Sequence, residues 1–178
     1  MFDQKNINVS NLLSISRIFL AIPIFFYLAA QKNDLALIVI AIAFITDFLD
    51  GYFARYFNQI TELGKILDPL ADKICTTAGI LALYFYQSFP LWLTLLIIGR
   101  DVVISIASLY FIGRKKMVLS SNRIGKTTVF VIALYACVYI FRWYTIAMFF
   151  HYIVIVLVLI SIINYGIVFR NELKRDSV

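Results

Sequence analysis

The sequence predicts an all-α integral membrane protein with six transmembrane helices. Its 178 residues are 62% hydrophobic and its mean hydropathy is +0.90, whereas soluble domains carry about 45–50% apolar residues. Polar residues gather in short breaks between apolar runs, and the sequence shows no sustained alternation of the β-strand type. Six spanning helices of about 20 residues need about 120 residues, which matches the apolar fraction. We therefore expect one membrane domain over residues 1–178.

The first three helices are defined by two polar breaks. The break at 31–34 separates the first apolar run from the second, and the break at 58–65 separates the second from the third. Such polar stretches do not continue a lipid-embedded helix. The predicted spans are 11–30, 35–57 and 67–87.

The last three helices follow in the same way. Breaks at 87–90 and 114–123 bound the fourth span, and a weaker break near 142–145 separates the last two. The predicted spans are 91–113, 124–142 and 146–169.

The basic residues indicate which way the chain crosses the membrane. With six spans both termini share one side, and that side holds thirteen of the 16 basic residues; Lys32 and Arg142 lie on the other side and Arg100 lies inside a span. The positive-inside rule makes the terminal side cytoplasmic, so we expect an N-in, C-in topology. Charges spread over loops in this way do not form a nucleic-acid-binding face, and no nucleic-acid partner is expected. The thirteen are Lys5, Arg17, Arg55, Lys65, Lys73, Arg114, Lys115, Lys116, Arg123, Lys126, Arg170, Lys174 and Arg175.

Four of the ten acidic residues crowd into two predicted spans. Asp47 and Asp50 are three residues apart, and Asp68 and Asp72 are four apart, so each pair shares one helix face. The second span runs inward and the third runs outward, so both pairs should lie near the cytoplasmic ends of neighbouring helices. A carboxylate inside a membrane helix is costly and marks a functional site.

Four carboxylates at one point require a cation. Hard oxygen ligands without His or thiolate suit Mg²⁺ or Mn²⁺, and a pair of such ions handles phosphate or pyrophosphate esters. Gly51, Ala54 and Gly64 would let phosphates approach the backbone, although small residues also serve ordinary helix packing in membranes.

These residues resemble the signature of the CDP-alcohol phosphatidyltransferase family. Asp47-x₂-Asp50-Gly51-x₂-Ala54-Arg55 is followed, after eight residues, by Gly64-x₃-Asp68-x₃-Asp72, which fills eight fixed positions within 26 residues. The family transfers a phosphatidyl group from CDP-diacylglycerol to an alcohol and releases CMP. The resemblance implies phospholipid biosynthesis in a multi-pass inner-membrane protein with its active site facing the cytoplasm, and it implies a homodimer.

The resemblance also implies a role for each motif residue. Asp47, Asp50, Asp68 and Asp72 would border two Mg²⁺ or Mn²⁺ ions, and Asp72 would be the general base. The nucleotide-lipid substrate would be bound at the positions matching the signature and near them; Arg55 read alone would be a snorkelling interface arginine, and Asn11 or Ser14 a helix cap. These CDP-diacylglycerol-binding candidates are Asn11, Ser14, Gly51, Ala54, Arg55, Thr61 and Gly64.

The acceptor alcohol is expected to be glycerol 3-phosphate, as in the phosphatidylglycerophosphate synthases that the opening 8–17 also resembles. Its two negative charges need cations, for which Arg100, Arg123 and Lys126 are the candidates. The pair Arg100-Asp101 leaves two alternatives open. It resembles the cardiolipin synthase branch, whose acceptor is phosphatidylglycerol, and the two side chains could simply pair with other buried polar groups.

Two other classes compete with this interpretation. A transporter could carry ions on intramembrane acids, but here the four acids cluster at one membrane end and inverted repeats are not visible. An intramembrane prenyltransferase also binds a diphosphate through metals, but it places its acidic segments far apart. CMP release that depends on a divalent metal would separate the first class from both others.

Overall fold

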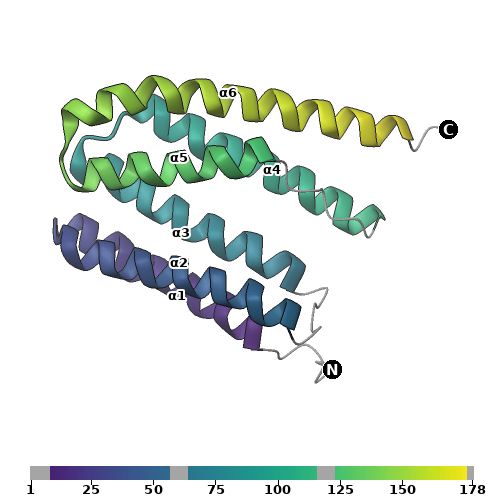
Figure 1. Cartoon of the computed structure of the whole chain (residues 1–178), viewed down its shortest axis with the longest axis horizontal. Helices are drawn as coiled ribbons and strands as arrows, with labels where there is room; N and C mark the ends of the chain where they lie inside the picture. The colour runs from purple at the N-terminus through teal and green to yellow at the C-terminus, as the bar shows by residue number, and fades with distance from the viewer. Residues whose placement is uncertain (1–8, 57–63, 116–122, 176–178) are drawn as a thin grey trace. The chain divides into compact units, whose positions relative to one another are not determined.

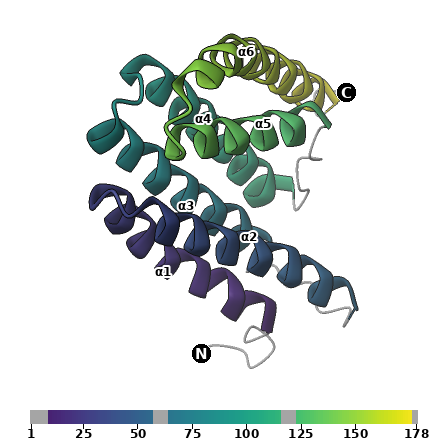
Figure 2. The same ribbon diagram turned by 60° about the vertical axis from the view of Figure 1, so that its left-hand side comes forward.

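The structure is a computed structural model that describes residues 9–56, 64–115 and 123–175. Within these ranges the chain forms six α-helices: α1 (Val9–Ala29), α2 (Asn33–Tyr56), α3 (Gly64–Gln87), α4 (Leu91–Lys115), α5 (Arg123–Ile140) and α6 (Tyr144–Arg175). Figures 1 and 2 show them from two directions. They fall into two compact units, Met1–Phe89 and Pro90–Val178, which are described separately.

The first unit is built around α1. This helix packs along both α2 and α3, whereas α2 and α3 contact each other little among the described residues. Its buried face presents Ile24 and Leu28, and the facing helices contribute alanines such as Ala36 and Ala71. Small residues let helices approach closely in a membrane protein, where dispersion rather than the hydrophobic effect drives association. Helix α1 is therefore the element that brings α2 and α3 into one site.

The second unit is built around α6. Helix α5 packs along it as an antiparallel neighbour, and α4 contacts it over a shorter stretch. Val154 and Val158 of α6 are fully buried, as is Tyr135 of α5. The hydroxyl of Tyr135 lies 2.9 Å from Nδ1 of His151, so a hydrogen bond joins α5 to α6 inside this apolar contact.

The six predicted helices are confirmed, with ends that shift by a few residues. The largest shift is in α6, which continues to Arg175 although the apolar run was expected to end at 169. Charged residues such as Lys174 are good helix formers once the chain has left the lipid. The weak break at 142–145 is confirmed, because α5 ends at Ile140 and α6 begins at Tyr144.

Within the described residues, three stretches are long and apolar enough to cross a membrane: Asn11–Ala29, Leu91–Ser108 and Tyr144–Asn171. The apolar part of α5, Ile124–Ile140, is shorter. Over their described residues, α2 and α3 are not among these spans. The chain is thus an all-α membrane protein, and the embedding of α2, α3 and α5 stays a prediction.

Two of the helix ends share one capping geometry without glycine. Gln31 has φ 55° and Arg142 has φ 59°, so each occupies the left-handed region just after its helix. The amide of Lys32 donates to Tyr27 O at 2.9 Å, and the amide of Trp143 donates to Val138 O at 3.1 Å. Each bond closes a Schellman motif, which satisfies carbonyls at the helix end. These tight turns set the antiparallel packing of α1 with α2 and of α5 with α6.

Candidate active site

A stripe of buried polar side chains runs along α1 in the first unit. Asn11, Ser14 and Arg17 are spaced three apart, so they share one helix face. Their exposed fractions are only 4%, 0% and 1%. Buried polar groups need partners, and a polar stripe inside an apolar helix therefore indicates what the neighbouring helices present.

The partners include two of the motif aspartates. The Ser14 hydroxyl donates to the Asp68 carboxylate of α3, and the Arg17 guanidinium pairs with the Asp47 carboxylate of α2. Asp68 also lies within electrostatic range of both Arg17 and Asp47. The two carboxylates thus meet at one level of α1, although the described residues of α2 and α3 contact each other little. Two of the four aspartates are thus brought together through a third helix, and the convergence of all four stays a prediction.

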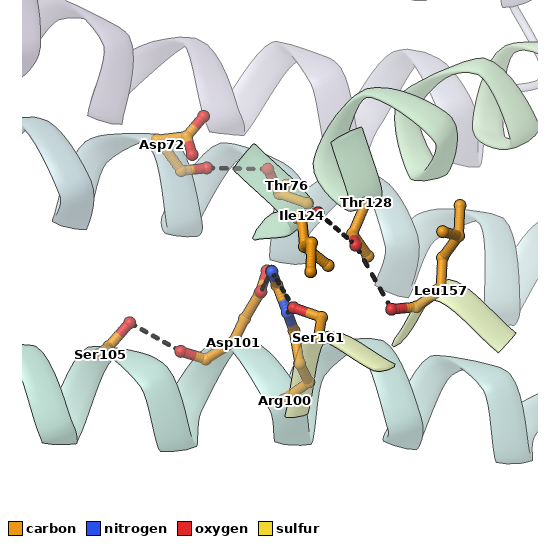
Figure 3. A network of polar contacts seen from close by, with 9 residues as sticks. All are labelled: Asp72, Thr76, Arg100, Asp101, Ser105, Ile124, Thr128, Leu157 and Ser161. Atoms are coloured by element: carbon orange, nitrogen blue, oxygen red, sulfur yellow. Dashed lines mark hydrogen bonds and ion pairs between the residues drawn. The ribbon is translucent and has the colours of Figure 1, made fainter. Parts of the chain in front are cut away.

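Asp72 lies one turn beyond Asp68 on α3, on the same face and half-buried. Its backbone carbonyl accepts a bond of 2.9 Å from the Thr76 hydroxyl (Figure 3). Cys75 donates its thiol to Arg17 O at 2.9 Å, which ties this turn of α3 to the same point of α1.

Several predicted site residues lie partly or wholly outside the description. Asp50, Gly51, Ala54 and Arg55 lie on the last turns of α2, but their side chains are not among those described. Thr61 lies outside the described residues. Gly64 is the first residue of α3 and is buried.

No group of three or more His, Cys, Asp or Glu side chains within the described part of the chain is arranged to hold a metal ion. Two of the motif carboxylates, Asp47 and Asp68, lie beside Arg17 and Ser14. The donor chemistry is still of the hard-oxygen type, and Asp50 follows Asp47 on the same helix. These residues are the ones that could hold Mg²⁺ or Mn²⁺.

In the second unit, Arg100 and Asp101 form a buried cluster with α6. The guanidinium of Arg100 lies 2.5 Å from the Asp101 carboxylate and donates to the Ser161 hydroxyl at 2.9 Å (Figure 3). The same group lies 5.9 Å from the centre of the Tyr165 ring, a cation–π distance. This is the pairing with buried polar groups that the sequence left open as an alternative, and the acceptor role of Arg100 stays a prediction.

The other two acceptor candidates lie at the start of α5. Arg123 is its first residue and has no described side chain, while Lys126 is exposed. Nearby, the Thr128 hydroxyl donates to Ile124 O at 2.8 Å and approaches Leu157 O of α6 at 3.3 Å (Figure 3). A polar contact of this kind fixes the register of α5 on α6.

Sequence reasoning missed the part that Arg17 has in the site, because that residue was counted as a topology charge. The signal was present: an arginine six residues into an apolar run lies on the same face as two other polar residues, Asn11 and Ser14. A charge in such a position calls for an opposite charge on a neighbouring helix.

The fold and this site together define a polytopic helical membrane protein with an acidic site assembled on its first helix. Residues 7–163 match the family model described as CDP-alcohol phosphatidyltransferase. This match covers most of the chain and runs through both units. The chain belongs to the CDP-alcohol phosphatidyltransferase family.

Individual relatives agree with this assignment. The CDP-diacylglycerol–glycerol-3-phosphate 3-phosphatidyltransferase of Aquifex aeolicus is 42% identical over 111 residues, which are 61% of this chain and 62% of that protein. The protein of the same name from Rickettsia typhi is 34% identical over 70% of this chain and 71% of its own length. The CMP-forming cardiolipin synthase of Streptomyces coelicolor is 34% identical over 57% of this chain and 50% of its own length. The chain thus spans about half to two thirds of the length of the first relatives it matches.

Proposed function

We propose that this protein transfers a phosphatidyl group from CDP-diacylglycerol to glycerol 3-phosphate and releases CMP. The observation that carries the proposal is the convergence of Asp47 and Asp68, two aspartates of the family signature, on Ser14 and Arg17 of α1. Relatives named for this reaction support the choice of substrates. We also propose that residues 1–178 form a single domain of this family.

The residues would divide the work by their positions. Asp47, Asp50, Asp68 and Asp72 would hold two divalent ions, Mg²⁺ or Mn²⁺, which offset the charge of the diphosphate when bound. Asp72 would take the proton of the acceptor hydroxyl as its oxygen attacks the β-phosphorus in line with the leaving CMP. Through its ion pair, Arg17 would hold the Asp47 carboxylate in a fixed orientation.

The substrate contacts proposed here are those that the signature and the basic residues indicate. Ser14 and Asn11 would line the nucleotide end together with Gly51, Ala54, Arg55, Thr61 and Gly64. Of the cation candidates for the acceptor phosphate we favour Arg123 and Lys126 over Arg100, because the Arg100 guanidinium is already engaged by Asp101 and Ser161.

The alternative acceptor is phosphatidylglycerol, which would make the protein a cardiolipin synthase. Relatives of that name are 34% and 43% identical to this chain, so the comparison alone favours neither branch strongly. An assay decides between them. Purified protein with CDP-diacylglycerol is offered glycerol 3-phosphate, phosphatidylglycerol, serine or inositol phosphate, and CMP release is measured with and without Mg²⁺ or Mn²⁺. We expect release with glycerol 3-phosphate and a divalent ion only; release with none of the four acceptors would overturn the proposal.

We further propose that the protein is a homodimer in the cytoplasmic membrane, with its site on the cytoplasmic side. The distribution of basic residues supports the orientation. The mass of the detergent-solubilised protein, measured by light scattering, tests the dimer.

A further inference from the structure

Three exposed aromatic side chains crowd into the turn between α5 and α6 (Figure 1). Phe141, Trp143 and Tyr144 are 49%, 54% and 51% exposed. The rings of Phe141 and Trp143 are stacked, with their centres 5.1 Å apart and 23° between their planes. Tyr144 contacts Tyr139 of α5 edge to face, with ring centres 5.8 Å apart. Phe141, Trp143 and Tyr144 therefore form one aromatic surface, which we call the aromatic turn.

The backbone holds the aromatic turn in a defined conformation. Arg142, between the two stacked residues, has φ 59°. The amide of Phe141 donates to Cys137 O at 2.9 Å, and the amide of Trp143 donates to Val138 O at 3.1 Å. The stacked rings are thus arranged before any partner arrives, which lowers the entropy that a contact with them costs.

The position of the aromatic turn along the chain places it at the edge of the hydrocarbon core. The stretch of α6 that is long and apolar enough to cross a membrane begins at Tyr144, and α5 ends at Ile140. Between them the chain is not helical, and it carries the charge of Arg142. Lipid-exposed irregular backbone does not occur within the hydrocarbon core, and an arginine there is costly. The turn therefore lies outside the core.

Bulk water is an equally poor environment for the aromatic turn. Three neighbouring rings, each about half exposed, would leave a large apolar surface in contact with water. The headgroup and glycerol region of a bilayer lies between the two environments and accepts both parts of such a side chain. Trp and Tyr are enriched there because an apolar ring carries a polar group at one end.

We propose that the aromatic turn is a lipid-binding surface, which holds this end of α6 in the headgroup and glycerol region of the bilayer. The Trp143 indole N–H is the donor for lipid ester or phosphate oxygens, and the stacked Phe141 ring adds apolar area beside it. Aromatic rings also suit contacts between proteins. The membrane is the occupant that the structure favours, because the apolar stretch of α6 begins within the aromatic turn. The proposal does not depend on the reaction proposed above.

Depth-dependent quenching of tryptophan fluorescence tests the proposal. The chain has two tryptophans, so Trp92→Phe leaves Trp143 alone and keeps an aromatic ring beside His151. The full-length variant is reconstituted in phosphatidylcholine vesicles whose acyl chains carry bromine either near the glycerol or near the chain ends. We expect several-fold stronger quenching by bromine near the glycerol. The derived depth should be about 15 Å from the bilayer centre, half the thickness of the hydrocarbon core.

A tryptophan in the middle of α6 is the matched control. Val156 is exposed and lies about 18 Å along the helix from Tyr144. In a chain that also carries Trp92→Phe and Trp143→Phe, Val156→Trp should be quenched more strongly by bromine near the chain ends. Circular dichroism checks that each variant is folded. Trp92→Tyr, which also keeps a ring, supplies a second background with the same expected result if Trp92→Phe does not fold.

Three results would overturn the proposal. Stronger quenching of Trp143 by bromine near the chain ends would place the aromatic turn inside the core. Quenching by aqueous acrylamide but by neither brominated lipid would place it in water. Quenching by none of these agents would show that protein covers the rings, as a second copy of the chain would.

Discussion

The Arg17–Asp47 ion pair joins a buried guanidinium to a carboxylate that is still 52% exposed. Breaking a fully buried pair costs about 3–5 kcal/mol, and solvent around Asp47 reduces this figure. We expect Arg17→Gln to lower the free energy of unfolding by about 2 kcal/mol. Denaturation in detergent micelles, followed by circular dichroism, measures the change.

A double-mutant cycle separates the pair from other effects of Arg17. Asp47→Asn removes the second charge, so the double variant should be more stable than the sum of the two single changes predicts, by about 1 kcal/mol or more. Simple additivity would show that Arg17 stabilises the helix by packing alone.

Asp72 is the residue at which the proposed chemistry is tested most directly. Asp72→Asn keeps the size and the helix position but cannot accept the acceptor's proton, so turnover should fall at least about 100-fold. CDP-diacylglycerol binding, measured by calorimetry, should remain largely intact. Asp34→Asn, an exposed aspartate in the first turn of the same unit's α2, is the matched control. Turnover retained by Asp72→Asn would remove the base assignment.

That each pair of motif aspartates shares one helix face was predictable from spacing, because i, i+3 and i, i+4 neighbours lie on the same face. The identity of their partners was not. Whether Arg17 is a topology charge or an ion-pair partner depends on which helix lies beside α1, and the sequence does not state which helices pack together. The same holds for Arg100, whose partner Ser161 lies 61 residues away.

At the scale of the helices, Gly125 marks a close contact between α5 and α6. A Cβ atom at this position would lie 2.7 Å from the Tyr165 hydroxyl oxygen and 3.0 Å from its ring. Gly125→Ala must therefore push the Tyr165 ring aside, and with it the ring's contact with Arg100. We expect a loss of about 1–2 kcal/mol of stability, as for other overpacked sites.

Gly99 supplies the control for this prediction. Nothing lies within 4 Å of a Cβ built there, so Gly99→Ala should be neutral or stabilising by up to about 1 kcal/mol through helix propensity. In thermal unfolding, the melting temperature of Gly125→Ala should lie below that of the unchanged protein, and the melting temperature of Gly99→Ala should be equal to it or higher. Equal shifts would mean that Tyr165 adapts without cost.

In the turn after α1, a substitution is expected to raise the stability of the protein. Gln31 holds φ at 55°, where a side chain costs about 1–2 kcal/mol, while a glycine there loses about 0.5–1 kcal/mol of chain entropy on folding. Gln31→Gly should therefore raise stability by about 0.5–1 kcal/mol. Gln31→Val, with a branched side chain, should lower it. A drop in melting temperature for the glycine variant would show that the Gln31 side chain makes a compensating contact.

At the scale of the whole molecule, the predicted topology has both termini in the cytoplasm. Alkaline phosphatase, which is active only outside the cytoplasm, should be inactive when fused after residue 178 and active when fused at the turn near Lys32. A fluorescent protein that folds only in the cytoplasm should give the reverse pattern. The predicted topology puts an odd number of membrane-crossing helices between the two points of fusion. Activity of both phosphatase fusions would contradict it.

The number of helices and most of their ends were predictable, because breaks of polar residues in a 62% hydrophobic chain leave few choices. The far end of α6 was not, since apolar content says where lipid contact stops and not where a helix stops. The central place of α1 was equally out of reach. Chain order suggests that α2 packs on α3, whereas the structure puts α1 against both.

Helix α6 has a length that ordinary membranes do not match. Its apolar stretch, Tyr144–Asn171, has 28 residues and measures about 42 Å, against a hydrocarbon core of about 30 Å. To keep that stretch in contact with acyl chains, the helix must incline or bend, or the bilayer must thicken around it, and a thinner bilayer increases the mismatch. The fit of α6 in the bilayer, and with it the packing of the protein, therefore depends on the thickness of the surrounding membrane.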